Sequence, residues 1–271
     1  GRNDRSETRG WIERALVTAA GDAKLRARAH AECAADALAR AQLGDAERHA
    51  LAAREHALEA GEEKLLSGVV RVLCLAALER ADFAAAVRFA EESHALSLRS
   101  GDRQSILLAQ IYLGYAKRGF GAFAEAAKHF RDAADGFAAL GDALSRAHAL
   151  HGVADSLLEQ GRVADAKQLY HDVLRTCVAL VERDLIAHCV AGLAAVAVEE
   201  RELADAARLW GAVHGAERRA QTRLMAFERA LYEPRIDRAR RALGEETFAA
   251  AYAEGVALSE RAHDSAAIAA G

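Results

Sequence analysis

Small and apolar residues return along the chain with a period of forty residues. Alanine occupies five positions of this register, with an apolar residue three places before each alanine and a small residue twelve places before it. The five alanines are Ala46, Ala86, Ala126, Ala166 and Ala206. A fixed period of this length is typical of stacked supersecondary units, each of which needs its neighbours to bury its apolar face. The pattern therefore predicts five repeats rather than one closed core.

Each repeat reads as a pair of helices. In the third repeat, Gly101 suits the end of the preceding helix and Asp102 can cap the next one. Apolar residues with helical spacing then predict a first helix over 103–119 and, after the break at Gly121, a second over 123–139. We call the first helix of each pair helix A and the second helix B.

Small residues on the two helices of a pair predict close packing. Gly114 and Ala126 are expected to face each other in the third repeat, and Phe130 is expected to fill the gap toward the next repeat. The predicted fold is an all-α, right-handed solenoid of about five TPR-like helix pairs of forty residues.

The predicted domain plan has three parts. Residues 1–21 form an N-terminal linker and capping helix over 8–19, and residues 221–271 form C-terminal capping helices and a linker. The repeats occupy 22–220, as 22–60, 62–100, 102–140, 142–180 and 182–220. In the C-terminal part, helices are expected over 221–231, from Pro234 to about 243, and over 245–261, followed by a linker or frayed end from 264.

Composition agrees with a helical protein and narrows its class. The chain is 52% hydrophobic, has one proline and carries a net charge of −4, which gives no global attraction to nucleic acid or anionic membranes. No apolar run reaches the length of a membrane helix, and the N-terminus does not resemble a signal peptide. We therefore expect a cytoplasmic protein without direct nucleic-acid or membrane contacts.

Cysteine usage and the chain start add two expectations. The four cysteines, Cys33, Cys74, Cys177 and Cys189, are widely spaced and form no C-x-x-C pair, which favours buried thiols in a reducing compartment. The chain starts at Gly1, and its only methionine is Met225. We expect a piece of a longer protein.

The motif Leu113-Gly114, followed by Ala126-x-x-x-Phe130 and Ala133, resembles the tetratricopeptide repeat. The longer period resembles the MalT-like tetratricopeptide domains of large bacterial signalling proteins. The segments 206–212, 232–233, 241–248 and 253–259 resemble the closing part of such domains in high-GC, actinobacterial-type bacteria. The resemblance implies a parent protein with an ATPase module and often a LuxR-type DNA-binding domain, as in LuxR-family transcriptional regulators.

The sequence offers no catalytic motif. It contains no phosphate-binding glycine loop, no H-E-x-x-H and no G-x-S-x-G. The basic cluster between Arg218 and Arg241 is interspersed with acids and favours an ion-paired helix surface. These 271 residues are therefore predicted to be no enzyme and to hold no cofactor or metal.

The strongest candidate site is the helix A face that a repeat superhelix turns inward. Positions spaced i, i+3 and i+7 should line this groove. The candidates for a ligand or partner groove are Arg28, Arg71, Tyr115, Arg118, His148, His151, Asp155 and His188.

Three interpretations of these residues stay open. They form a recognition groove for a protein, a peptide or a small effector, since concave solenoid faces bind ligands. They are polar groove residues without a ligand. Or His148, His151, His188 and Asp155 bind a metal, an interpretation that helix spacing alone supports weakly.

The predicted function is binding. We expect a sensor or regulatory TPR domain of a multidomain bacterial signalling regulator, a transcriptional one, which also contacts the neighbouring domains of its parent chain. The alternatives are a regulatory arm attached to a nucleotide cyclase or Ser/Thr kinase, and a constitutive protein-interaction scaffold.

Overall fold

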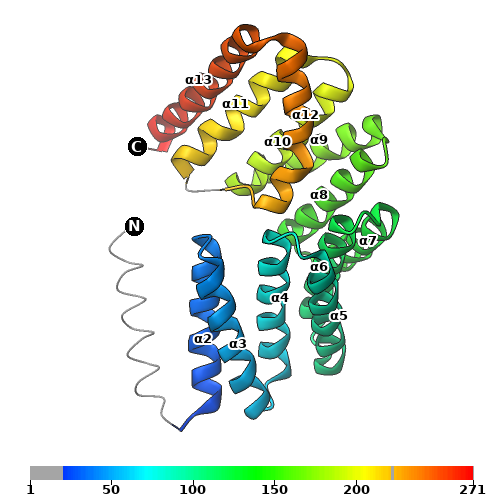
Figure 1. Cartoon of the computed structure of the whole chain (residues 1–271), viewed down its shortest axis with the longest axis vertical. Coiled ribbons are helices and arrows are strands. Elements are labelled where there is room, and N and C mark those ends of the chain that lie inside the picture. The colour runs from blue at the N-terminus through cyan, green and yellow to red at the C-terminus, as the bar shows by residue number, and fades with distance from the viewer. Residues whose placement is uncertain (1–20, 221–222, 271) are drawn as a thin grey trace. The chain divides into compact units, whose positions relative to one another are not determined.

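The protein is all-helical, as a computed structural model of the chain shows. The structure describes residues 21–220 and 223–270, and this part contains twelve helices and no strand (Figure 1). The predicted capping helix over 8–19 lies outside the described residues. The expected all-α array of TPR-like helix pairs is confirmed.

The chain divides into two compact units, the first ending at Ala122 and the second beginning at Phe123. Unit 1 contains α2 (Ala23–Ala39), α3 (Leu43–Glu59), α4 (Glu63–Glu79), α5 (Phe83–Ser100) and α6 (Arg103–Gly119). Unit 2 contains α7 (Phe123–Ala139), α8 (Ala143–Glu159), α9 (Val163–Leu180), α10 (Arg183–Glu199), α11 (Leu203–Ala220), α12 (Ala226–Leu243) and α13 (Glu245–Ala270).

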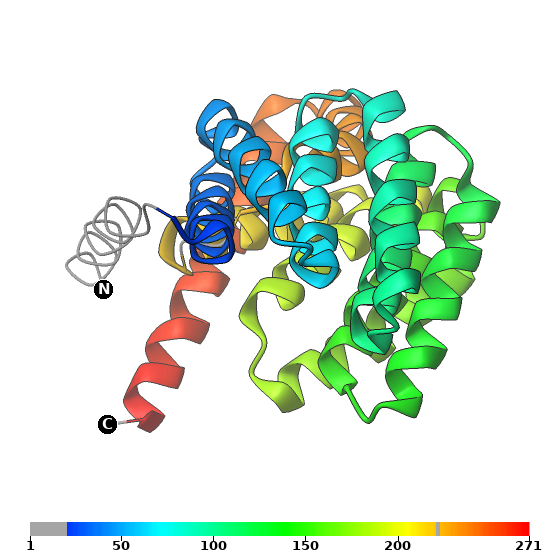
Figure 2. The same cartoon turned by 90° about the horizontal axis from the view of Figure 1, so that it is seen from below.

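The bounds of α6 and α7 are those that the periodicity predicts. Gly114 and Ala126 now lie in different units, so their pairing stays a prediction. Within unit 1, successive helices lie side by side, and helix A of one pair also contacts helix A of the next (Figures 1 and 2).

Glycine followed by an acid forms the turn between several pairs. Gly101 has a φ of 67°, and the Asp102 carboxylate accepts a hydrogen bond of 2.9 Å from the backbone N–H of Ser105. This confirms the predicted helix end and cap. Before α10 the glycine is replaced by Val181, which has a φ of 57° and is 72% exposed. A β-branched residue is strained in this conformation, so this turn departs from the others.

Small residues bring the two helices of a pair together. The recurring alanines at 46, 86, 126, 166 and 206 are all fully buried. In the second pair the Cys74 thiol donates to the carbonyl oxygen of Ala86 at 3.4 Å, which places a side chain of α4 directly against the backbone of α5. All four cysteines are free thiols, and Cys74, Cys177 and Cys189 are buried while Cys33 is half-buried.

Aromatic rings seated on glycines join successive pairs of unit 2. The fully buried ring of Phe130 fills the space beside Gly152, where a Cβ atom would come within 2.5 Å of it. Tyr170 occupies the same place against Gly192, at 2.4 Å from such a Cβ. The expectation that Phe130 fills the gap toward the next repeat is confirmed, and the glycine is what makes room for the ring.

Two predictions for the C-terminal part are wrong. The chain does not break near Pro234, which lies inside the continuous helix α12. Proline removes one helical hydrogen bond, but Tyr232 and Ile236 are buried on either side of it and fix both halves of the helix. The segment from 264, expected as a linker or frayed end, is helical rather than a linker, because α13 continues to Ala270 through an alanine-rich stretch of high helix propensity, and fraying of this end stays a prediction.

Helix α13 packs along α11 at very short range (Figure 1). A Cβ atom on Gly211 would lie 2.1 Å from the carbonyl oxygen of Tyr252, and one on Gly255 would lie 1.8 Å from that of Arg208. Only glycine allows two helix backbones to approach in this way. No helix in the described part of the chain has the length and apolarity to cross a membrane.

We predict that Gly152→Ala destabilises the protein. A methyl group at this position must displace the buried Phe130 ring, and overpacking of this kind costs about 1–3 kcal/mol, which exceeds the gain in helix propensity of about 1 kcal/mol. Gly68→Ala is the matched control, since its Cβ would make only an ordinary contact of 3.5 Å with Arg71. Urea unfolding followed by circular dichroism should show lower stability for Gly152→Ala and unchanged or higher stability for Gly68→Ala. Equal stability of the two variants would contradict the role given to the ring.

Candidate functional site

The structure distributes the predicted groove residues over both units. Unit 1 carries Arg28 on α2, Arg71 on α4, and Tyr115 and Arg118 on α6. Unit 2 carries His148, His151 and Asp155 on α8 and His188 on α10. Every one of them lies on a helix A, as the periodicity requires, but their exposure differs widely.

Asp155 is the centre of a buried hydrogen-bond cluster in unit 2. Its carboxylate is 1% exposed, and one of its oxygens, Oδ1, accepts hydrogen bonds from the hydroxyls of Tyr170 at 2.7 Å and Tyr232 at 2.6 Å. The other, Oδ2, lies 3.7 Å from Nδ1 of His151, which is also buried. Tyr170 comes from α9 and Tyr232 from α12, so three helices meet at this carboxylate. Asp155 and His151 are therefore packed inside unit 2 rather than exposed in a groove, because Tyr170 contacts both of them and Tyr232 bonds to Asp155.

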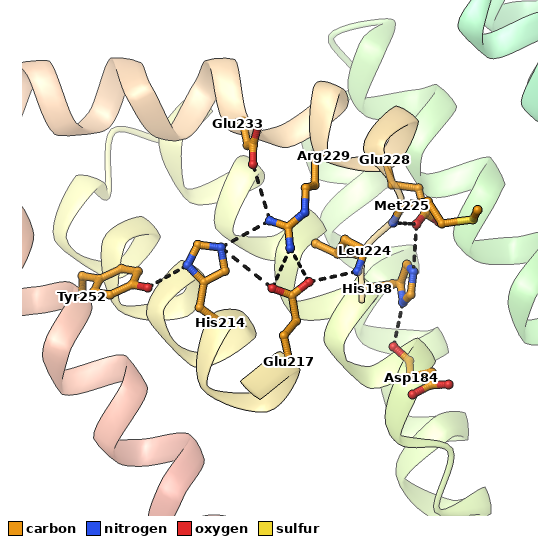
Figure 3. Close-up of polar contacts among 10 residues, drawn as sticks. All are labelled: Asp184, His188, His214, Glu217, Leu224, Met225, Glu228, Arg229, Glu233 and Tyr252. Atoms are coloured by element: carbon orange, nitrogen blue, oxygen red, sulfur yellow. Dashed lines mark hydrogen bonds and ion pairs between the residues drawn. The ribbon is translucent and has the colours of Figure 1, made fainter. Parts of the chain in front are cut away.

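His188 carries a positive charge. Its Nδ1 lies 2.7 Å from the carbonyl oxygen of Asp184, and its Nε2 lies 3.1 Å from Oε2 of Glu228 on α12 (Figure 3). Both neighbours only accept hydrogen bonds, so both ring nitrogens must carry a proton. Burial lowers the pKa of His188, but the charge and hydrogen bond of Glu228 outweigh it and raise this pKa to about 9.

His148 is neutral beside this cation. Burial and the neighbouring imidazoles of His151 and His188 lower the pKa of His148 to about 4. His148, His188 and Glu228 stand forty residues apart on α8, α10 and α12, so they occupy one repeat position on three helices. Along these three positions His148 is neutral, His188 is a cation and Glu228 is an anion.

A second polar cluster joins α11, α12 and α13 (Figure 3). Glu217 of α11 accepts two hydrogen bonds from Arg229 of α12, at 2.5 and 2.7 Å, and one of 2.9 Å from the backbone N–H of Leu224. Arg229 also donates to Nε2 of His214 at 3.3 Å, while Nδ1 of His214 lies 2.7 Å from the Tyr252 hydroxyl on α13. Nε2 of His214 must therefore be unprotonated, and burial lowers the pKa of His214 accordingly.

Sequence reasoning missed the α12 residues. Glu228 and Tyr232 are equivalent to His188 and Gly192 one period earlier, so the register of forty continues one step beyond the five predicted repeats. Extending the period would have placed α12 beside α10, which it does contact.

In unit 1 three of the predicted residues, Arg71, Tyr115 and Arg118, take part in a series of contacts between arginines and tyrosine rings. Arg71 lies over the ring of Tyr112 at 5.9 Å, and the Tyr112 and Tyr115 rings meet edge to face at 6.2 Å. The buried Arg118 lies 5.4 Å from the centre of the Tyr115 ring. Arg28 is exposed and lines an open pocket of about 410 Å³ between α2 and α4. Positive charge and aromatic surface are thus combined on the helix A face of unit 1.

The metal interpretation finds no support. Among the residues that the structure describes, no group of three or more His, Cys, Asp or Glu side chains is arranged to hold a metal ion.

No protein-family model matches the chain, and no curated protein does. Several solved structures are similar to the chain. The apo form of RapI has a TM-score of 0.60 at 11% identity, over 86% of this chain and 90% of that one. The kinesin light chain of Podosopora anserina with nearly identical TPR-like repeats has a TM-score of 0.54 at 18% identity, over 72% of this chain and 96% of that one.

A Rap protein complexed with competence and sporulation factor is also similar, with a TM-score of 0.54 at 14% identity over 86% of this chain and 65% of that one. At these identities the likeness shows the fold, a TPR-like array. The resemblance to MalT-like and LuxR-family regulators stays a prediction.

We predict that His188→Gln flattens the fall in stability between pH 6.5 and 9. The folded state holds the His188 proton up to about pH 9, and the unfolded chain only to about 6.5. This contribution is fully present below pH 6.5 and is lost as pH rises toward 9, on the order of 3 kcal/mol. Urea unfolding at both pH values checks it.

His94→Gln is the control for this measurement. The pKa of His94 in unit 1 is lowered by burial, so His94 adds nothing to the slope above pH 6.5. If the free energy of unfolding changes with pH as steeply in His188→Gln as in the unsubstituted chain, the charged state assigned to His188 is refuted.

Proposed function

We propose that the chain is a regulatory binding module whose helix A faces receive a protein or peptide partner or a small effector. In its finer form, the proposal is the sensor arm of a multidomain bacterial signalling regulator, a transcriptional one, acting in the cytoplasm. Binding would shift the parent protein between two states, to the extent that the ligand prefers one of them.

The observation that carries this proposal is the polar attachment of α12. In Figure 3, Glu228 of α12 pairs with His188 and Arg229 of α12 pairs with Glu217, and α12 buries the charged side chain of Glu228 together with Tyr232. Arg235 adds ion pairs to Glu159 at 2.7 Å and Glu199 at 2.9 Å. A helix attached by polar groups can exchange these partners for a ligand's polar groups or for water at smaller cost than one attached by a large apolar face.

The structural neighbours support binding on such a fold. One Rap structure is an apo form, and another is a complex with competence and sporulation factor. We carry over to this chain the expectation that a TPR-like array of this kind accepts a partner.

A constitutive scaffold is the alternative that one observation favours. Asp155 and its two tyrosines are buried, and a buried carboxylate with satisfied hydrogen bonds resists opening. If α12 never leaves this cluster, the module holds its partner without switching. A regulatory arm of a cyclase or kinase would differ from the proposed regulator only in the attached output domain.

Two tyrosine variants distinguish a switch from a scaffold. Tyr232→Phe removes the bond between α12 and Asp155, whereas Tyr252→Phe removes a hydroxyl bonded to His214 between α11 and α13. The partner is first captured from a lysate of the source organism with the unsubstituted chain. It is then titrated against the unsubstituted chain and against each of the two variants. For a switch, we predict that Tyr232→Phe changes partner affinity at least threefold and that Tyr252→Phe does not.

Hydrogen exchange supplies the second measurement. Partner binding should change the exchange of α12 amides in a regulatory module. Equal affinities together with unchanged α12 exchange would leave only the scaffold. If no protein, peptide or small molecule binds the unsubstituted chain, the binding function itself is refuted.

A further inference from the structure

The pocket of about 410 Å³ in unit 1 lies between α2 and α4, the A helices of the first two pairs. Its lining residues on α2 fall at positions 28, 31, 32 and 35, and those on α4 include positions 65, 68, 69 and 72. Residues three, four and seven places apart share one face of a helix. The pocket is therefore formed by one face of each helix, and it includes Arg28, one of the predicted groove residues.

The wall of this pocket is apolar. Leu65, Val69 and Val72 line it from α4, whereas Ala31 and Ala35 line it from α2. Because the side chain of alanine is a single methyl group, α2 fills little of the space in front of the larger residues of α4. An apolar wall with a few polar groups beside it is the usual make-up of a small-molecule site.

Four charged residues also line the pocket, and two of them already have a partner in the chain. Lys64 pairs with Asp102 at 2.8 Å, and Glu62 pairs with Lys24. These two charges are balanced by the protein itself. The other two charged lining residues, both on α2, therefore decide which charges the pocket offers to a ligand.

Arg28 and Glu32 are exposed, and within the described part of the chain neither side chain forms an ion pair or a hydrogen bond. They lie one turn apart on the same face of α2. Their order, with the base before the acid, is the less favourable one for an ion pair between positions i and i+4. The pocket thus offers a ligand one guanidinium and one carboxylate beside an apolar wall.

We propose that this pocket binds a free α-amino acid with an aliphatic side chain. Such a zwitterion carries a carboxylate and an ammonium group on the same carbon atom, and the two groups match Arg28 and Glu32. The planar guanidinium of Arg28 donates two parallel hydrogen bonds to the carboxylate, and Glu32 accepts from the ammonium group. The aliphatic side chain lies on Leu65, Val69 and Val72. A ligand with only one charge would leave one of the two α2 side chains without a partner.

The inference deepens the proposed function, on which it rests, since it names the chemical class of the small effector. Exposed ion pairs contribute little, so burial of the aliphatic side chain supplies most of the affinity. We expect saturable binding of leucine with a dissociation constant in the millimolar range, followed by the amide chemical shifts of the ¹⁵N-labelled full chain. Alanine should bind more weakly than leucine, and glycine more weakly than alanine.

Two analogues of leucine test the two charges separately. N-acetylleucine keeps the carboxylate but has no ammonium group, and leucinamide keeps the ammonium group but has no carboxylate. Each should bind about threefold more weakly than leucine, the loss expected for one exposed ion pair. The analogues also imitate the last and the first residue of a peptide, so they distinguish a free amino acid from a peptide end.

Two variants and two controls locate the site. Arg28→Gln should weaken leucine binding about threefold and leave leucinamide binding unchanged, because leucinamide has no carboxylate to lose. Glu32→Gln should weaken leucine binding by a similar factor and leave N-acetylleucine binding unchanged. Arg88→Gln on α5 and Glu55→Gln on α3 change exposed charges that do not line the pocket, and they should leave every affinity unchanged. Circular dichroism checks that each variant keeps its helix content.

Three outcomes would overturn the inference. The first is the absence of saturable shifts on addition of leucine. The second is binding of N-acetylleucine or leucinamide as tight as that of leucine, which would assign the pocket to a peptide end. The third is leucine binding that both Arg28→Gln and Glu32→Gln leave unchanged. None of these results affects capture of a protein partner or the response of α12, so the two proposals fail separately.

Discussion

An aromatic ring seated on a glycine of the next helix A holds successive pairs of unit 2 together. Helix pairs that bury their apolar faces only against each other must match volumes at this contact. Phe130 meets Gly152 and Tyr170 meets Gly192, each ring filling the space that a side chain would take. In unit 1 the equivalent positions hold Ala90 and Tyr112, so the small residue is on helix B and the large one on helix A.

The same register explains why α12 is attached by polar groups. The next position in the series of Gly152 and Gly192 is Tyr232, so the ring of Trp210 finds no glycine on α12. Trp210 is instead buried beside His214, at 5.1 Å between ring centres, and the Tyr232 hydroxyl extends to Asp155. The ring-on-glycine contact between successive pairs thus ends at Gly192 of α10, and hydrogen bonds and ion pairs contribute where the array ends. Terminal units of solenoids are expected to be atypical, and here the difference lies in one tyrosine.

How much the sequence predicts depends on whether a feature is local. The bounds of α6 and α7 follow from helical spacing and from turn glycines such as Gly101, because both act within a few residues. The fate of Asp155 does not, because its donors lie 15 and 77 residues away. Spacing of i, i+3 and i+7 identifies one face of α8 but not what covers it. Pro234 misleads for the same reason, since distant contacts of Tyr232 and Ile236 hold α12 together across it.

Glycines inside the A helices have different surroundings, which the sequence alone does not distinguish. Gly152 lacks a side chain because a ring of the preceding helix occupies its place, so it contributes to stability. Gly68 has no such ring, and a Cβ atom there would make only an ordinary contact of 3.5 Å with Nη2 of Arg71. On the helix A face of unit 2 the side chains pair with one another, as His188 and Glu228 do, whereas in unit 1 Arg71 donates to the Ser67 hydroxyl and lies over the Tyr112 ring.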